Sequence, residues 1–335
     1  MVVLSQEDGM TRNFTIRSAG STRRAPWALL GPSGMAFAIL VILFVLSRQL
    51  SDRMTAVVYT SQDQVYAEPI LRQFEEEAGI PLRVVYDSEA VKTVGLVNRL
   101  IAERDHPQCD VFWNNEELRT RQLEAMGVLQ AEVGWAPFGY RSRRVVIHTN
   151  LVGLAQVPRS LLDLTNAVWK GRVAIAYPLF GTTATHFLAL RHHWGEEVWK
   201  QWCRGLRANE ALVVDGNSMV VKLVGQGEAW VGLTDSDDIA AGQREGLPVI
   251  ALPVSVETLL IPNTVALVRG GVMGESSRRL MEYLQQPATL GALVEANALE
   301  SAGLPADDTT LQPDWPRLME GMQADTAWLK DLFIR

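Results

Sequence analysis

Cysteine and positive charge are both scarce in this sequence, and each shortage excludes a class of protein. The 335 residues include only two cysteines, Cys109 and Cys203. Their spacing fits neither a zinc site nor a disulfide framework, so we predict two small buried side chains. Lysine and arginine number 31 against 38 aspartates and glutamates, which gives a formal net charge of -7. Nucleic-acid binding needs a basic surface, so nucleic acid is excluded as a partner.

The short motifs of common hydrolases are also missing. Neither G-x-S-x-G nor H-E-x-x-H occurs in the chain, and neither cysteine has plausible histidine support. His192 and His193 are adjacent on a predicted helix, so their side chains diverge and do not form a compact metal pair. We interpret these two and His186 as structural or surface residues, and we expect a protein that is not an enzyme.

The start of the chain contains a long stretch without charge. Residues 25–47 carry no charged side chain and follow four arginines at positions 12, 17, 23 and 24. This charge bias predicts that residues 1–24 stay cytoplasmic and that the rest is exported. Residues 25–47 are just long enough for an uncleaved transmembrane anchor; a cleaved signal is the alternative, although no A-x-A site follows. We expect a periplasmic or cell-envelope protein, held in the inner membrane by this segment unless it is cleaved.

From residue 55 onward, short apolar runs alternate with amphipathic stretches, beginning with Ala56–Tyr59 and the helical pattern Tyr66–Ala78. This alternation predicts an α/β fold with a parallel sheet and helices on both faces. Two strands near residues 140–150 and 253–265 run between the halves of the chain, which predicts two lobes and a two-strand hinge. The predicted lobe 1 comprises residues 55–145 plus 258–335, and lobe 2 comprises residues 146–257.

Polar residues follow the carboxyl ends of several predicted strands, which is the edge where open α/β sheets bind ligands. Two loop-to-helix junctions, at Gly181 and at Asn217, present free backbone N–H groups and the positive end of a helix dipole, which suits an anion. The predicted ligand-binding residues are Ser61, Asp63, Asn114, Asn115, Gly181, Thr182, Thr183, Asn217, Ser218, Thr234, Asp235 and Asp237.

The acidic segment Thr234–Asp238 has two interpretations. Aspartate, serine and threonine are preferred at helix N-caps and first turns, so the segment begins the next helix in the first interpretation. In the second, Asp235 and Asp237 face the cleft and coordinate a hard cation, or bind an amine, together with Asp63. Carboxylate oxygens suit such cations. Both roles are compatible, because one acid can cap while another faces the ligand.

Several short segments resemble those of bacterial extracellular solute-binding proteins and occur in the same order. They are Val57–Tyr59, Leu161–Leu164, Trp169–Arg172 and Asn217-Ser218. The resemblance covers about residues 55–300 and is closest to the ferric-ion-binding periplasmic proteins of ABC importers. It implies a two-lobed periplasmic-binding-protein fold and delivery of cargo to an ABC permease and its ATPase. We expect a monomer without a resident cofactor, whose cargo is a metal ion with a synergistic anion.

The family's binding site carries over only in part. The resemblance implies an anion-binding loop at Phe180–Thr183 and an anion-contacting asparagine at Asn217. Asp63 stands where ferric-ion binders often have histidine, and Asn115 stands where they have glutamate. The paired tyrosines that grip ferric ion are absent, and Thr234–Asp238 occupies their place. The departure puts ferric ion in doubt and leaves the solute-binding function intact.

The leading hypothesis is therefore an extracytoplasmic solute-binding component that captures iron or another metal ion with its anion by hinge closure. A membrane-anchored ligand-sensing domain is an alternative, because an uncleaved anchor is compatible with signalling to another protein. A hydrolase or lyase on the same two-lobed architecture is a further alternative, since a fold does not dictate chemistry.

Overall fold

The computed structural model describes residues 36–37, 39–42, 55–87, 94–132, 134–272, 274–303 and 309–334. The chain divides into two units, residues 1–52 and 53–335, and each is described by itself. The predicted cytoplasmic segment and most of the predicted anchor lie outside the described residues, and the few described positions between 36 and 42 are helical. Of the helices in the described ranges, none is both long enough and apolar enough for a bilayer crossing.

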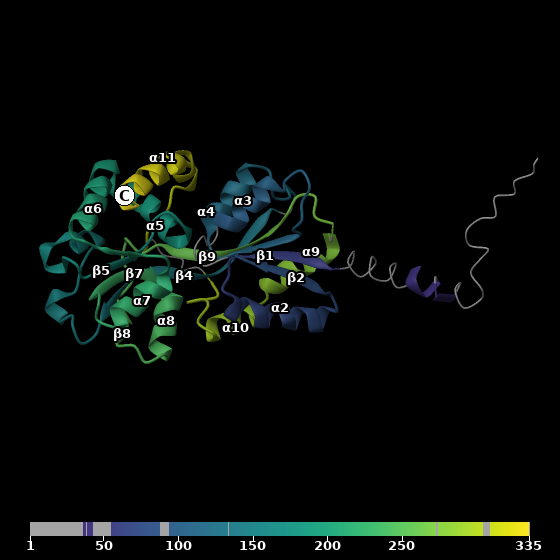
Figure 1. Cartoon of the computed structure of the whole chain (residues 1–335), viewed down its shortest axis with the longest axis horizontal. Helices are drawn as coiled ribbons and strands as arrows, with labels where there is room; N and C mark the ends of the chain where they lie inside the picture. Colours follow the sequence, from purple (N-terminus) through teal and green to yellow (C-terminus); the bar gives the residue numbers. More distant parts are fainter. Residues whose placement is uncertain are drawn as a thin grey trace, which may run out of the picture. The chain divides into compact units, whose positions relative to one another are not determined.

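The described part of residues 53–335 is organised around one mixed sheet with two halves (Figure 1). In the first half, β1 (Ala56–Thr60) pairs in parallel with β2 (Leu82–Tyr86) and with β3 (Val111–Asn114). Strand β9 (Leu260–Leu267) pairs antiparallel with β3. Strands β1 and β3 are buried along their whole length, which explains their continuous apolar sequence.

The second half repeats this arrangement with different strands. Here β5 (Val173–Ala176) pairs in parallel with β6 (Leu212–Val214) and with β7 (Val231–Asp235). The short strand β8 (Val249–Ala251) pairs antiparallel with β4 (Trp135–His148). The prediction of parallel strands in both parts of the chain is confirmed, with antiparallel strands added where the halves meet.

Strand β4 belongs to both halves of the sheet. Its residues 135–142 pair with β9, and its residues 143–147 pair with β7. A strand was expected near residues 140–150, so β4 begins earlier than expected. The first part was missed because Pro137 and Gly139 weaken the strand pattern. Gly139 has φ +53° at a bulge, and a Cβ there would lie 2.4 Å from Leu299 Cδ1, so this position requires glycine.

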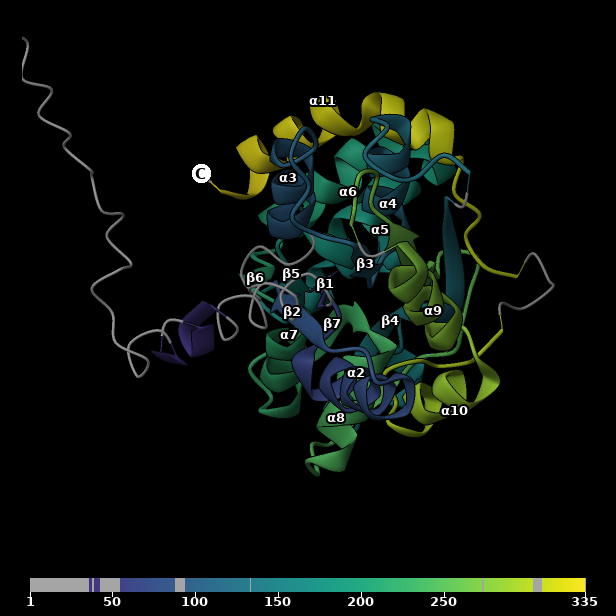
Figure 2. The same ribbon diagram turned by 90° about the vertical axis from the view of Figure 1, so that its right-hand side faces the viewer.

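Helices cover both faces of each half, as expected for this fold class. In the first half they are α2 (Gln64–Ala78), α3 (Val94–Ala102), α4 (Glu117–Ala125), α9 (Gly274–Leu284) and α10 (Pro287–Glu295). In the second half they are α5 (Gly181–Trp194), α6 (Glu196–Ala208), α7 (Asn217–Gly225), α8 (Ser236–Arg244) and α11 (Trp315–Phe333). Figures 1 and 2 show α3, α4, α5, α6 and α11 above the sheet, and α2, α7, α8 and α10 below it.

Short 3-10 turns precede β5, at Leu154–Gln156, Leu161–Thr165 and Ala167–Trp169. Serine at position 160 and the apolar residues after it predict a helix over Ser160–Leu164, and the structure has a 3-10 turn there, shifted by one residue. Ser160 is its N-cap, and its Oγ accepts a hydrogen bond from the backbone N of Leu162. A capping serine outside the turn accounts for the shift.

The C-terminal helix α11 packs on the second half of the sheet. Its Leu318 and Phe333 share a buried cluster with Phe187 of α5 and Trp199 of α6, and the rings of Phe187 and Phe333 lie 6.2 Å apart. The sequence analysis placed residues 258–335 wholly in lobe 1, and this packing differs from that expectation. Helical periodicity identifies an apolar face but not the surface that it covers.

The two cysteines are buried and unpaired, as predicted. The apolar face of α6 is confirmed at Trp199 and Trp202, which are both buried. Val198, which was expected on the same face, is exposed. Cys203 is buried on this face instead, and Val198 points away from it because helical neighbours differ by about 100° in direction.

Candidate functional site

A cavity of about 50 Å³ lies where strands of both halves end. Eight of the twelve predicted ligand-binding residues line it: Asp63, Asn115, Gly181, Thr182, Thr183, Asn217, Asp235 and Asp237. The remaining lining residues are Arg141, Ala176, Tyr177, Phe180, Asp215, Gly216 and Asp238. Asp63 and Asn115 follow β1 and β3, whereas Thr182, Asn217 and Asp235 begin α5, α7 and α8. The two halves therefore contribute to one site.

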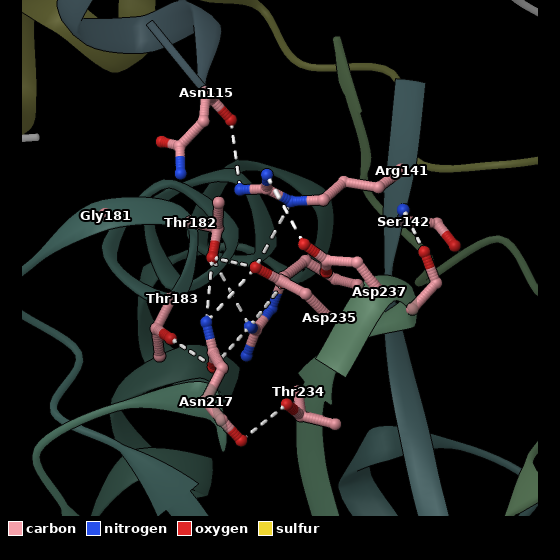
Figure 3. Close-up of polar contacts among 12 residues, drawn as sticks. Asn115, Arg141, Ser142, Gly181, Thr182, Thr183, Asn217, Thr234, Asp235 and Asp237 are labelled. Carbon is pink, nitrogen blue, oxygen red and sulfur yellow. Dashed lines mark hydrogen bonds and ion pairs between the residues drawn. The ribbon is translucent and has the colours of Figure 1, made fainter. Parts of the chain in front are cut away.

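Asp235 is the centre of a hydrogen-bond network in this wall (Figure 3). Its Oδ1 accepts from Arg143 Nη1 at 2.7 Å. Its Oδ2 accepts from Thr182 Oγ1 at 2.7 Å and from Asn217 Nδ2 at 3.1 Å. Arg143 Nη1 also donates to Asn217 Oδ1 at 2.8 Å. Both oxygens of Asp235 are thus occupied by protein donors.

Burial alone raises the pKa of Asp235, but the nearby guanidinium groups outweigh it. The charges of Arg143 and Arg141 and the hydrogen bonds from Thr182 and Arg143 leave the pKa of Asp235 below its ordinary value. Asp235 is the N-cap of α8, yet its side chain makes no capping hydrogen bond. The capping interpretation therefore does not describe Asp235, whose side chain is directed to the arginines.

Arg141 joins the two walls of the cavity. It is only 2 % exposed, and its Nη2 donates to the backbone oxygen of Asn115 at 3.1 Å. Its Nε lies 3.5 Å from Asp235 Oδ2, and its Nη1 lies 3.7 Å from Asp237 Oδ2. Burial lowers the pKa of Arg141, and the carboxylates of Asp237 and Asp235 raise it above its usual value. Among the described residues, Nε and Nη1 find no hydrogen-bond acceptor, so they remain available to a ligand.

The carboxylates at the start of α8 cluster, although not in the predicted combination. Oxygens of Asp235, Asp237 and Asp238 lie within 4.8 Å of one another. The predicted metal-binding set was Asp63, Asp235 and Asp237. Asp63 lines the same cavity but lies outside this group. Because Asp235 is already paired with arginine, Asp237 and Asp238 are better placed than Asp235 to bind a cation.

The other four predicted residues do not line the cavity. Ser61 Oγ donates to Asn114 Oδ1 at 2.6 Å and accepts from the backbone N of Asn115 at 2.9 Å. Thr234 Oγ1 donates to the backbone oxygen of Asn217 at 3.0 Å. These three buried residues therefore orient cavity residues, and Ser218 lies outside the lining altogether.

Sequence reasoning missed the two arginines of β4. Positions two apart in a strand face the same side, so Arg141 and Arg143 place two charges on one face. Val145 and Ile147, on the same face of the strand, are apolar. Two arginines on the same face as these apolar residues were the available signal. They were missed because ligand-binding residues were sought after the ends of predicted strands, and both arginines lie within one.

A further polar contact joins the halves beside the cavity. Glu116, at the N-cap of α4, accepts from the backbone N of Arg119 at 3.0 Å and from Thr185 Oγ1 of α5 at 3.1 Å. Glu116 is fully buried, and this burial raises its pKa to about 6. A carboxyl group between α4 and α5 therefore titrates near neutral pH.

Comparisons with known proteins agree with this architecture. The family described as bacterial extracellular solute-binding protein matches residues 55–296. The Fe(3+)-binding periplasmic protein of Serratia marcescens is 29 % identical over 223 residues, which cover 61 % of this chain and 63 % of that protein. The chain thus spans less than two thirds of the length of this relative.

Solved structures share the fold at low sequence identity. Iron-bound HitA from Pseudomonas aeruginosa has a TM-score of 0.72 at 18 % identity, with 84 % of this chain and 99 % of that chain covered. The periplasmic binding protein AfuA from Actinobacillus pleuropneumoniae, with fructose-6-phosphate bound, has a TM-score of 0.70 at 17 % identity and the same coverage. These similarities confirm the two-lobed periplasmic-binding-protein fold. Together with the match over residues 55–296, they show that the chain belongs to the bacterial extracellular solute-binding protein family.

Proposed function

We propose that this protein is the solute-binding component of an ABC import system, which delivers its cargo to a permease driven by an ATPase. The observation that carries the proposal is a single cavity lined by residues of both sheet halves, with Asp63 and Asn115 on one side and Thr182, Asn217 and Asp235 on the other. A site built from two lobes is the arrangement by which a binding protein closes on its ligand.

Closure about the cavity uses the strands that join the halves. In this proposal lobe 1 comprises residues 55–145 and the segment from 258 through α10, and lobe 2 comprises residues 146–257 together with α11. Strand β4 changes its partner from β9 to β7 between Ser142 and Arg143, so bending there moves one half against the other. Arg141 lies next to this point and contacts both walls, so closure of the lobes changes its contacts.

The proposed cargo is a metal ion held with a small anion. Support comes from relatives named for ferric ion and from the carboxylates of Asp237, Asp238 and Asp63 at the cavity, because hard cations prefer carboxylate oxygens. The starts of α5 and α7 supply backbone N–H groups for the anion. Tyr177 also lines the cavity and offers a phenol oxygen, although the paired tyrosines of ferric-ion binders are absent.

Arg141 favours a second candidate, a small organic solute with a phosphate or carboxylate group. Its buried Nε and Nη1 have hydrogen-bond capacity at the cavity wall, and guanidinium groups bind such anions in a fork. In this alternative the carboxylates of Asp237 and Asp238 accept hydroxyl or amine groups of the same solute.

Calorimetric titration of the protein distinguishes the two cargoes. Ferric ion with phosphate is compared with fructose 6-phosphate, and each is tested on the Asp237→Asn and Arg141→Lys variants. The metal cargo predicts ferric binding that falls at least tenfold in Asp237→Asn. The organic cargo predicts hexose-phosphate binding that falls at least tenfold in Arg141→Lys. Asp105→Asn, a change at an exposed acid outside the cavity, is the matched control. If neither probe binds, the proposed cargo classes are wrong.

We also propose that the protein works outside the cytoplasm as a monomer, held at the inner membrane by residues 25–47. The support is the uncharged run behind four arginines. Cell fractionation tests the anchor, because an anchored chain should sediment with the inner membrane. Replacement of residues 1–47 by an unrelated cleavable signal should release the protein into the periplasm. Release of the unaltered chain would contradict the anchor.

A further inference from the structure

A second cavity, of about 210 Å³, lies beside the proposed cargo cavity in the second half. It is lined by Arg143, Val145, Val157, Pro158, Arg159, Ser160, Leu161, His186, Leu233, Leu252, Pro253, Val254, Ser255, Glu257 and Thr258. None of these residues lines the first cavity. His186 lies one helical turn beyond Thr182 on α5, and Arg143 lies two residues beyond Arg141 on β4. The two cavities therefore lie next to each other along the same strand and helix.

His186, which lines this second cavity, has a buried ring nitrogen without a hydrogen-bond partner among the described residues. The residue is 0 % exposed, and its Nε2 lies 2.7 Å from the backbone oxygen of Glu257. A carbonyl oxygen only accepts, so Nε2 carries the proton. Burial and the charge of Arg143 lower the pKa of His186 to about 3, so the ring is neutral at physiological pH. Its Nδ1 then bears a lone pair, and it has no hydrogen-bond partner among the described residues.

Arg143 lines the same cavity and, within the described ranges, has one buried nitrogen without an acceptor. The side chain is 1 % exposed, and its two terminal nitrogens are engaged: Nη1 donates to Asp235, and Nη2 donates to the backbone oxygen of Leu233 at 3.1 Å. Its Nε–H finds no acceptor in the described part of the chain. A buried donor and a buried acceptor without partners are costly, so a molecule that satisfies both is favoured.

The carboxylate of Glu257, which also lines the cavity, already has hydrogen-bond partners. Glu257 Oε1 accepts from Ser160 Oγ at 2.7 Å and from Trp194 Nε1 at 3.2 Å, and Oε2 accepts from the backbone N of Leu161 at 2.6 Å. This buried carboxylate and the lone pair of His186 both repel an anion. The rest of the lining is largely apolar, including Val145, Leu233 and Leu252.

We propose that this second cavity is a binding site for a small neutral molecule with an apolar body and one hydroxyl or carboxamide group. The group accepts from Arg143 Nε–H and donates to His186 Nδ1, while the apolar body fills the space between β4, β7 and the segment 253–258. A volume of about 150 Å³ holds a benzene molecule, so the cavity has room for a substituted ring. The site is separate from the cargo cavity and does not depend on the identity of the cargo.

Benzamide and benzoate form a matched pair of probes, because they share a shape and differ in net charge and in whether the polar group donates. Binding to the full-length protein is measured by the ring resonances of His186 in NMR titrations and by thermal stability. Benzamide should shift the His186 resonances and raise the melting temperature, and benzoate should bind at least tenfold more weakly.

Two substitutions in one exposed segment locate the binding. Val254 lines the cavity and is 45 % exposed, whereas Val256 is 56 % exposed and does not line it. Val254→Trp should weaken benzamide binding at least tenfold by filling the mouth, and Val256→Trp should leave it unchanged. Tighter binding of benzoate, equal loss in both variants, or no binding of benzamide would each overturn the proposal; the last result means that the cavity holds only water.

Discussion

The two walls of the proposed cargo cavity are built differently. In the wall from the second half, Arg143, Thr182, Asn217 and Asp235 bond to one another at distances between 2.7 and 3.5 Å. In the wall from the first half, Asn115 is oriented by Ser61, and no comparable charged network is seen among the described residues there. The second wall is a closed set of buried polar groups, and the first is a pair of side chains on strand ends.

This difference separates the residues that fix the geometry of the site from the residues that bind the ligand. A buried network in which every charge is compensated fixes its own geometry and resists rearrangement. Its members that line the cargo cavity have little capacity left for the cargo, and Asp235 in particular has both oxygens occupied. Recognition then falls to groups at the edge of the network, such as Arg141 and Asp237. Each prediction below tests this division.

The largest expected effect follows from removing Arg143. Arg143→Met leaves Arg141, at 3.5 Å, as the charged partner of the buried Asp235, and loss of one partner of a buried pair costs about 3–5 kcal/mol. We expect the free energy of unfolding to fall by about that amount in urea denaturation.

The control is Lys170→Met, because Lys170 and Glu210 form an exposed pair. Exposed pairs contribute only about 0–1 kcal/mol. If both substitutions cost the same, the network of the second wall is not the scaffold.

The next effect concerns Glu116, between α4 and α5. Its folded-state pKa of about 6 lies above the ordinary value of 4.5, so the folded protein holds this proton more tightly than the unfolded chain. The resulting stabilisation is complete below pH 4.5 and is lost as the pH rises through 6. This difference between the folded and unfolded pKa of Glu116 corresponds to about 2 kcal/mol.

Denaturation curves from pH 4 to pH 7 test this sign. The stability of the wild type relative to Glu116→Gln should decrease by about 2 kcal/mol over that range. Glu124→Gln, at an exposed position of the same helix, serves as the control and should track the wild type. A difference of opposite sign would show that Glu116 is stabilised as the carboxylate.

The smallest effect is expected in the first wall, at Ser61. Ser61→Ala removes the donor to Asn114 Oδ1 and the acceptor of the Asn115 backbone N–H. One buried hydrogen bond contributes about 1 kcal/mol, and orphaned partners add to the loss. We expect about 1–2 kcal/mol less stability, measured by urea denaturation.

Cargo affinity should also fall in this variant, because Asn115 lines the cavity and loses its support. A loss of affinity without loss of stability would show that Ser61 contacts the ligand directly. That result would contradict its role as a residue that orients Asn115.

Much of the fold was predictable from local patterns. Apolar runs such as Ala56–Tyr59 and Val173–Tyr177 predicted strands because buried parallel strands read as continuous apolar sequence. Glycine and polar residues after these runs marked the strand ends, so eight cavity residues were found without a structure. The resemblance to solute-binding proteins followed from segments that are themselves local in sequence.

What the sequence alone determined is the order of strands and helices and the sheet edge at which polar side chains collect, because both depend on periodicity and on turn residues. Only the tertiary structure decided that Asp235 meets Arg143 from 92 residues away, and that α11 covers the second half. An ion pair between distant strands depends on sheet register, and the packing of an apolar helix face depends on which surface is left uncovered. Neither is encoded by the spacing of nearby residues.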